Sequence, residues 1–187
     1  MNVGYCFTGS FCTFDKSITA MKSLVDKGYN VVPIMSYNAY SIDTRFATAK
    51  EFRDRIEQLC GNEIICTIDG AEPIGPKHMF DILCVVPCTS NTLAKLANGV
   101  NDTPVTMAVK SHLRNNKPVV IGVSTNDALG AAAKNIGTLL NYRCYYFVPM
   151  EMDNPCEKPR SLVCDFSKVL GTVECALNGI QYNPIFQ

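Results

Sequence analysis

The sequence predicts an α/β fold, in the form of a three-layer α/β/α domain with a mostly parallel, six-stranded sheet. Short apolar runs alternate with longer amphipathic runs along the whole chain, and turn residues separate them. The chain has the length of one domain, with 187 residues, of which 47% are hydrophobic and 18% charged. Strands that alternate with helices favour parallel pairing with right-handed crossovers.

Six short apolar runs are the expected strands. They are rich in Val, Ile and Cys, and turn residues or amphipathic runs bound them. The fifth run is apolar throughout, which is typical of a strand buried on both faces. The strands are expected at residues 3–7, 30–35, 63–68, 82–86, 118–123 and 145–148.

Six amphipathic runs are the expected helices. In the first, Ile18, Met21 and Leu24 repeat at helical spacing and form one apolar face. Gly28 follows at the position where a helix commonly ends in a left-handed residue. The helices are expected at residues 14–27, 44–60, 92–99, 103–115, 127–141 and 161–178.

The remaining segments are expected to be irregular. Residues 69–77 contain two prolines and two glycines, which indicates a loop. Residues 149–160 contain three prolines and several charges, which indicates a loop or a mobile flap. Residues 181–187 are expected to be extended. The chain is therefore expected to be a single domain, residues 1–187, with a flap at residues 149–160.

Composition excludes several classes of function. The formal net charge is zero, so no electrostatic footprint points to nucleic acid or to an anionic membrane. No apolar stretch approaches the ~20 residues that span a bilayer, and the N-terminus does not resemble a signal peptide. The ten cysteines lie mostly inside apolar runs, without a CxxC pair or zinc spacing. We therefore expect a cytoplasmic protein with reduced thiols and no metal site.

Uncharged polar residues follow four of the expected strands. In open parallel sheets, ligands bind at the carboxyl ends of the strands. Neutral hydroxyl and amide donors suit the phosphate, the ribityl chain and the ring edge of a nucleotide-like cofactor, whereas a metal or a catalytic triad needs other residues. The loop after the first strand has an ordinary alternative, a tight turn with an N-cap, and the loop after the second strand has another, an ordinary polar loop. The candidates are Gly9, Ser10, Ser36, Thr89, Ser90, Asn91, Thr92, Ser124, Thr125 and Asn126.

Histidine is scarce, which limits the acid–base chemistry that the chain can perform. His78 precedes the fourth expected strand, and His112 lies toward the end of an expected helix. Both positions favour structural or solvated roles. A bound cofactor is therefore expected to supply the difficult chemistry.

Residues 87–102 carry a recognisable pattern, PCTSNT followed by LAKLANGVND. It resembles the signature of the flavoprotein family that includes phosphopantothenoylcysteine decarboxylase and the peptidyl-cysteine decarboxylases, P-x-S-A-N-T followed by L-A-K-x-A-x-G-x-x-D. The resemblance implies a Rossmann-like or flavodoxin-like fold that binds FMN. It also implies that Asn91 is the catalytic residue, donating to a substrate carboxylate. The other strand-end candidates would hold the cofactor.

Three further segments, residues 71–77, 113–130 and 146–161, are similar to a narrower family, the B subunits of dipicolinate synthase. This resemblance implies a protein that helps to oxidise dihydrodipicolinate to dipicolinic acid in the mother cell of a spore-forming bacterium. It implies an A subunit that uses NADP or NAD, and a homo-oligomer, either a trimer or a dodecamer. A doubly anionic substrate calls for cations, and the candidates are Lys77, Lys110, Arg114 and Arg160.

Two alternatives to this function remain open. The decarboxylases carry a catalytic histidine before the fourth strand, where residues 68–77 contain none, and a cysteine in the flap, where Cys156 is the candidate. One alternative is therefore an FMN-dependent decarboxylase of a cysteinyl substrate. The other is a non-catalytic, FMN-binding scaffold for the A subunit.

Overall fold

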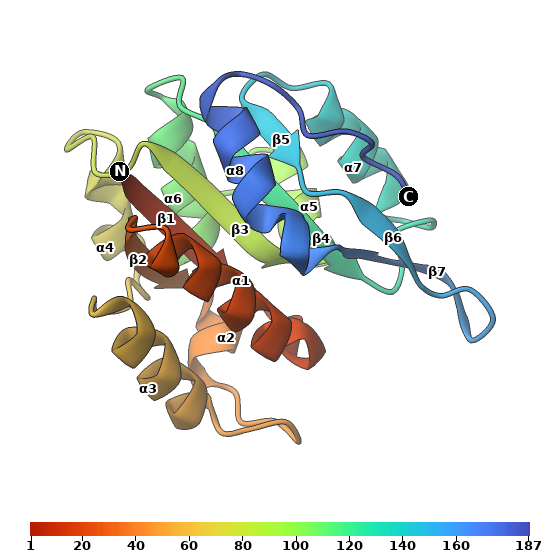
Figure 1. Cartoon of the computed structure of the whole chain (residues 1–187), viewed down its shortest axis with the longest axis horizontal. Coiled ribbons are helices and arrows are strands. Elements are labelled where there is room, and N and C mark those ends of the chain that lie inside the picture. Colours follow the sequence, from red (N-terminus) through yellow and green to blue (C-terminus); the bar gives the residue numbers. More distant parts are fainter.

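The computed structural model describes residues 1–187 and shows a seven-stranded sheet between two layers of helices (Figure 1). The strands follow the order β2-β1-β3-β4-β7-β6, and β5 pairs with β4. They are β1 (Asn2–Phe7), β2 (Asn30–Met35), β3 (Ile82–Cys88), β4 (Val119–Thr125), β5 (Tyr145–Phe147), β6 (Met150–Asn154) and β7 (Lys158–Cys164). The prediction of an α/β/α domain with a mostly parallel sheet is confirmed.

Helices cover both faces of the sheet, and each face has its own apolar core. Alternate residues of β3 face opposite sides, so that Ile82 and Cys84 enter one core while Leu83 and Val85 enter the other. One core packs against α1, α3 and α8, and the other packs against α5, α6 and α7. The helices are α1 (Phe14–Asp26), α2 (Tyr37–Ser41), α3 (Ala49–Cys60), α4 (Ile68–Ala71), α5 (Ser90–Ala97), α6 (Pro104–Leu113), α7 (Ala133–Leu140) and α8 (Val169–Leu177).

The strand expected at residues 63–68 does not form. Only Ile65 pairs with β2, through bonds from its N–H to the Pro33 carbonyl and from the Met35 N–H to its own carbonyl, both 2.9 Å. The next bond toward Glu63 would need an N–H on Pro33, which proline lacks. On the other side, Thr67 caps α4 and ends the extended chain. The prediction of a third parallel strand at this edge is therefore wrong.

The segment expected as a flap and the start of the last expected helix instead form two antiparallel strands. β6 and β7 make a hairpin whose tip extends beyond the rest of the sheet (Figure 1). Ser124 and Thr125 at the end of β4 pair with Val163 and Leu162 of β7, which inserts the hairpin into the sheet. The sheet consequently has seven strands rather than six, and α8 begins only at Val169.

Several other element boundaries differ from those expected. The helix expected from residue 44 begins at Ala49, where Thr48 and Glu51 form a capping box. The helix expected from residue 127 begins at Ala133. The loop expected at residues 69–77 contains the end of α4 and a 3₁₀ turn, Glu72–Ile74.

None of the helices combines the length and the apolar character that a membrane span requires. All ten cysteines carry free thiols, and burial raises the pKa of the Cys6, Cys84, Cys88 and Cys164 thiols. No group of three or more His, Cys, Asp or Glu side chains is placed to hold a metal ion.

His112 of α6 is buried, with 1% of its surface exposed, and its Nε2 lies 3.1 Å from the Pro118 carbonyl oxygen. Burial opposes the charged imidazolium and lowers the pKa of His112 to about 4, from an ordinary value of 6.5. His78 is exposed in a turn with a positive φ of 50°. His112 therefore has a structural role inside the protein rather than at a solvated helix end.

The buried His112 predicts a loss of stability in mild acid. The unfolded chain takes up a proton at His112 as pH falls through 6.5, whereas the folded chain resists it until about pH 4. The free energy of unfolding should therefore fall by up to about 3 kcal/mol across this window, relative to a variant without this group. Urea unfolding of the wild type and of His112→Gln between pH 7.5 and 4 measures the difference, and a constant difference would contradict the prediction.

Candidate functional site

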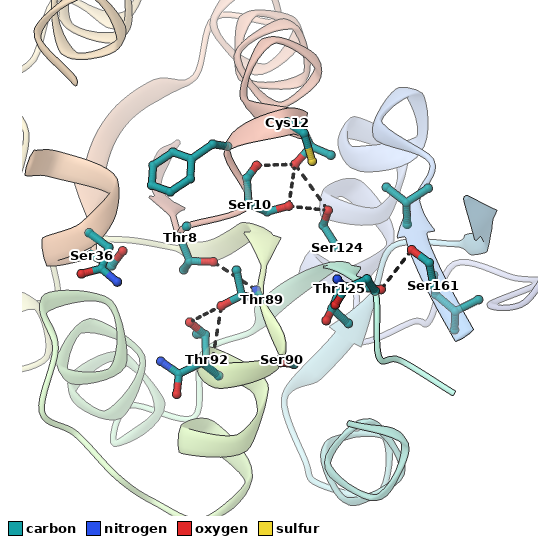
Figure 2. A pocket seen from close by; sticks show the side chains of 18 of the residues that line it. Thr8, Ser10, Cys12, Ser36, Thr89, Ser90, Thr92, Ser124, Thr125 and Ser161 are labelled. Carbon is teal, nitrogen blue, oxygen red and sulfur yellow. Dashed lines mark hydrogen bonds between the residues drawn. The ribbon is translucent and has the colours of Figure 1, made fainter. Parts of the chain in front are cut away.

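One large cavity, of about 1020 Å³, lies at the carboxyl ends of the parallel strands (Figure 2). The loops that follow β1, β2, β3 and β4 all contribute to it, as does the inserted strand β7. All ten strand-end candidates are among the residues that line it: Gly9, Ser10, Ser36, Thr89, Ser90, Asn91, Thr92, Ser124, Thr125 and Asn126. The structure thus brings together in one place the residues that the sequence had placed in four separate loops.

Three hydroxyl groups join the loop after β1 to the end of β4. The Oγ atoms of Ser10 and Ser124 are 2.8 Å apart (Figure 2). Thr13 donates to the Ser10 carbonyl oxygen over 2.8 Å, and its hydroxyl lies 3.4 Å from the Ser124 Oγ. Helix α1 begins at the next residue, Phe14, so its N-terminus lies beside these hydroxyls. A helix N-terminus with adjacent hydroxyl donors is a favourable place for a phosphate.

Thr8 connects the ends of β1 and β3. It is 1% exposed, its hydroxyl donates to the Pro87 carbonyl oxygen over 2.8 Å, and it accepts the Thr89 N–H over 3.1 Å. These bonds fix the backbone where the register of β3 shifts, between Val85 and Cys88. They therefore set the position at which α5 begins and presents its first turn to the cavity.

The first turn of α5 combines a capping role with free donors. Thr89 is the N-cap, and its side chain accepts the Thr92 N–H over 3.4 Å. Ser36 caps α2 in the same way, through the Ala39 N–H. The Asn91 side chain is exposed and makes no hydrogen bond within the protein. Its amide is therefore available to a ligand in the cavity.

Strand β7 adds residues that the sequence had not indicated. Ser161 donates to the Thr125 carbonyl oxygen over 3.3 Å, and Leu162 and Val163 also line the cavity. The Thr125 hydroxyl donates to Asp127 over 2.5 Å. Asn126, which lies between these two residues in the chain, lines the cavity. The contributions of Ser161, Leu162 and Val163 depend on the antiparallel pairing of β7 with β4.

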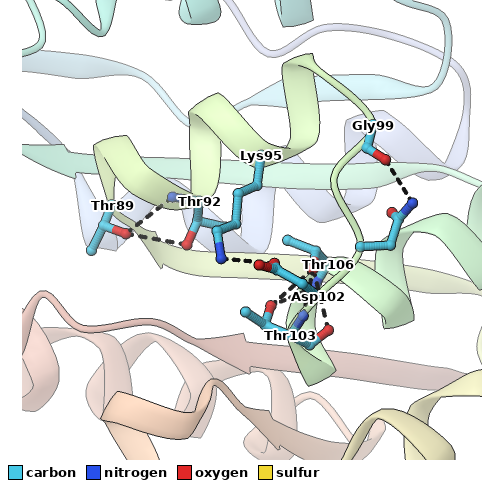
Figure 3. Close-up of polar contacts among 8 residues, drawn as sticks. Thr89, Thr92, Lys95, Gly99, Asp102, Thr103 and Thr106 are labelled. Carbon is cyan, nitrogen blue, oxygen red and sulfur yellow. Dashed lines mark hydrogen bonds and ion pairs between the residues drawn. The ribbon is translucent and has the colours of Figure 1, made fainter.

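Four cations line the cavity, namely Lys16, Arg45, Lys95 and Lys158. Lys95 donates to Asp102 over 2.7 Å (Figure 3), and this bond lowers the pKa of the Asp102 carboxyl. Lys158 pairs with Asp153 over 2.5 Å. Two of the four charges are therefore balanced by acids that also line the cavity.

The Lys95–Asp102 pair lies next to a second fixed point. Thr103 caps α6 in a capping box with Thr106, and the hydroxyls of these two residues are 2.9 Å apart (Figure 3). Together the two contacts tie the connection between α5 and α6, and they hold Thr103 at the cavity wall. Lys95 and Asp102 belong to the signature of residues 87–102, so a signal for them was present in the sequence.

The four cations expected to bind the substrate are not among the residues that line this cavity. Lys110 and Arg114 lie at the C-terminal end of α6, whereas Thr103 lines the cavity at the N-terminal end. Ten helical residues extend about 15 Å, which separates the two ends. Lys77 is exposed in the turn before β3, and the Arg160 side chain lies beside Gly130. Any binding role for these four stays a prediction.

The cavity is chemically a binding site with many neutral donors. Neither histidine lines it, and its acids Asp102 and Asp153 are both paired with lysines. Cys156 is not among its lining residues either. The site is therefore suited to holding and orienting a polar ligand rather than to acid–base catalysis by its own side chains.

Comparisons with known proteins agree with this geometry. A family model described as Flavoprotein matches residues 1–173. The chain is 41% identical over 183 residues to the B subunit of dipicolinate synthase from Bacillus subtilis, covering 98% of this chain and 92% of that protein. The crystal structure of the B subunit of dipicolinate synthase from Bacillus halodurans C superposes with a TM-score of 0.91 at 40% identity, over 100% of this chain and 95% of that one.

More distant structures share the fold. The FMN-dependent cysteine decarboxylase SpaF has a TM-score of 0.68 at 21% identity, with 96% of each chain covered. Burkholderia xenovorans DmrB in complex with FMN, described as a cubic protein cage for redox transfer, has a TM-score of 0.70 at 17% identity, over 95% of this chain and 96% of that one. The similarity to the decarboxylase is therefore weaker than the similarity to the two synthase proteins.

Proposed function

This chain belongs to the flavoprotein family, and we propose that it is the B subunit of a dipicolinate synthase. In this role it helps to oxidise dihydrodipicolinate to dipicolinic acid, together with an A subunit that uses NADP or NAD. The observation that carries the proposal is the 41% identity to the Bacillus subtilis protein over 98% of the chain. The cytoplasm of the mother cell of a spore-forming bacterium is the expected location.

The residues at the cavity fit FMN. The cavity volume, about 1020 Å³, is at the upper end of the range for ligand sites and leaves room for a substrate beside a cofactor. Ser10, Thr13 and Ser124 would hold the phosphate beside the N-terminus of α1. The first turn of α5, from Ser90 onward, would donate to the ring edge or to a substrate carboxylate. When bound, FMN supplies a hydride acceptor for the oxidation of a dihydropyridine.

The chain's own part in the reaction is to bind and to orient. Aromatisation of a dihydropyridine needs a hydride acceptor and little acid–base chemistry, which agrees with a cavity that no histidine lines. Thr8 fixes the start of α5, and this in turn sets where the Asn91 amide meets the substrate. Cysteine decarboxylation is less well supported, because neither a histidine nor Cys156 lines the cavity.

We also propose a homo-oligomer, a trimer or a dodecamer. The structural relatives include a cubic cage and a dodecameric FMN-dependent decarboxylase. Light scattering of the purified protein distinguishes these two states from a monomer.

Reconstitution tests the proposed activity. Purified chain, A subunit, nicotinamide cofactor and dihydrodipicolinate should together produce dipicolinate, and the isolated chain should show a flavin spectrum whose released chromophore has the mass of FMN. If the A subunit alone reaches full turnover, the chain is not catalytic, and the scaffold alternative is preferred. A colourless chain that also fails to take up added FMN would contradict the cofactor assignment.

Replacement of Ser124 tests the phosphate position. Ser124→Ala removes a buried hydroxyl that contacts Ser10 and Thr13, so the dissociation constant for FMN should rise about tenfold. The exposed Ser167, which bonds to Asp165 in a 3₁₀ turn and does not line the cavity, provides the matched control Ser167→Ala. Quenching of flavin fluorescence measures both variants, and equal affinities would place the phosphate elsewhere.

A further inference from the structure

Two of the four cations at the cavity have no acid partner. Lys95 and Lys158 are paired with Asp102 and Asp153, whereas no carboxylate lies within 4.0 Å of Lys16 or Arg45. Across the chain, seven ion pairs form, and neither residue takes part in one. Unpaired cations beside a cavity are the groups that an anionic ligand neutralises most favourably.

Lys16 and Arg45 come from different parts of the fold. Lys16 lies in the first turn of α1, close in sequence to Thr13 and the hydroxyls proposed for the phosphate. Arg45 lies between α2 and α3, in a segment that also brings Phe46 to the cavity. The two unpaired charges therefore come from different elements, and Arg45 is followed directly in the chain by an exposed aromatic residue, Phe46.

The turn that carries Arg45 is held by its own hydrogen bonds. Asp43 accepts the Ala49 N–H over 2.8 Å, and Thr44 accepts the Phe46 N–H over 3.2 Å. The Thr44 N–H also donates to the Ala47 carbonyl oxygen over 3.1 Å. Asp43, the acid next to this turn, is thus engaged with the backbone rather than with the Arg45 guanidinium.

The Arg45 guanidinium lies over the Phe46 ring, so a positive charge and an exposed apolar ring are adjacent at the cavity. The guanidinium carbon of Arg45 lies 4.9 Å from the centre of the Phe46 ring, and Phe46 is 48% exposed. A large aromatic residue exposed at a cavity wall is available to pack on a planar ligand. A guanidinium binds a carboxylate through two parallel hydrogen bonds, which an ammonium cannot do.

We propose that Arg45 and Phe46 are the specificity-determining residues for a planar pyridine dicarboxylate. Phe46 packs against the ring of the ligand, and Arg45 binds one of its two carboxylates. This inference rests on the proposed function, since it assigns the substrate contacts within the same cavity. It replaces Lys77, Lys110, Arg114 and Arg160, which do not line the cavity, as the source of the substrate-binding charge.

Titration with two small acids tests this assignment. FMN-loaded protein is titrated calorimetrically with pyridine-2,6-dicarboxylate and with pyridine-2-carboxylate. The wild type should prefer the dicarboxylate, and Arg45→Gln should weaken its binding about tenfold to hundredfold and largely abolish the preference. Arg45→Lys should recover only part of the affinity, because the charge returns without the paired donors. Phe46→Leu should weaken both acids by a similar factor.

Two controls separate this inference from the cofactor assignment. Arg143→Gln removes an exposed cation outside the cavity and should bind both acids as the wild type does. The affinity of Arg45→Gln for FMN should equal that of the wild type. A wild type that takes up FMN but does not bind the dicarboxylate overturns the inference and leaves the cofactor assignment intact. Loss of FMN and dicarboxylate binding by the same factor would instead assign Arg45 to the cofactor.

Discussion

Replacement of Asn91 by alanine should reduce turnover of the reconstituted synthase about 100-fold or more, the size expected when a preorganised donor to a reacting group is lost. Asn91 lies in the first turn of α5, it lines the cavity, and its amide has no partner in the protein. The variant should therefore fold normally and keep its affinity for FMN. Steady-state kinetics with the A subunit and flavin absorbance measure the two properties separately.

The matched control for Asn91 is Asn98→Ala, at the other end of the same helix. The Asn98 amide bonds only to the Ala94 carbonyl oxygen, and Asn98 does not line the cavity. Its replacement should leave turnover within about twofold, since surface changes of this kind are usually small. If Asn91→Ala also retained full turnover, the first turn of α5 would not contact the reacting ligand, and the scaffold alternative would gain support.

Replacement of Gly75 by alanine should lower the free energy of unfolding by about 4 kcal/mol or more. The added methyl group overlaps neighbouring atoms, and the shift that relieves the overlap disrupts the hydrogen bonds of Gly75. An added Cβ would lie 2.1 Å from the Ser111 carbonyl oxygen and 2.7 Å from the Ser111 Oγ, so the backbone of α6 must move. The Gly75 backbone also makes two hydrogen bonds to this part of α6 and the residues after it. Its N–H donates to the Ser111 hydroxyl, and its carbonyl oxygen accepts from the Asn115 amide, both over 2.8 Å.

Urea unfolding of Gly75→Ala measures this loss, and Gly137→Ala provides the comparison. Gly137 lies inside α7, where an added Cβ meets no atom within 4 Å. Alanine there should be neutral or stabilise the protein by up to about 1 kcal/mol. A Gly75→Ala variant that unfolds at the wild-type urea concentration would show that the approach of the 3₁₀ turn to α6 is not tight in solution.

The strand-end residues show how much of a site can be predicted from local sequence pattern and sheet topology. Ser10, Asn91 and Ser124 lie far apart in the chain, yet their meeting in one cavity was predicted, because parallel strands end at the same edge of a sheet. The structure adds that Ser36 and Thr89 cap helices, whereas the sequence predicted only an ordinary polar loop as the alternative for Ser36. The individual binding roles of these residues stay predictions until the variants are measured.

The failures have a different origin. Residues 63–68 form no strand because Pro33 on the neighbouring strand cannot donate the next hydrogen bond. The hairpin of β6 and β7 was missed because its insertion depends on pairing with the end of β4, which is distant in the chain. In both cases the deciding hydrogen-bond partner lies far away in sequence, where no local pattern records it.

Hydrophobic periodicity and turn residues are local properties, and they were enough to specify the α/β class, five of the seven strands and the strand-end loops. Which charges reach the cavity depends instead on three-dimensional packing. The sequence does not show which end of a helix faces a cavity, so a basic residue at either end is an equal candidate. In the structure, the length of α6 separates Lys110 and Arg114 from the cavity wall at Thr103. Arg45 lines the cavity because the turn between α2 and α3, which local hydrogen bonds hold, meets the other strand-end loops in the folded chain.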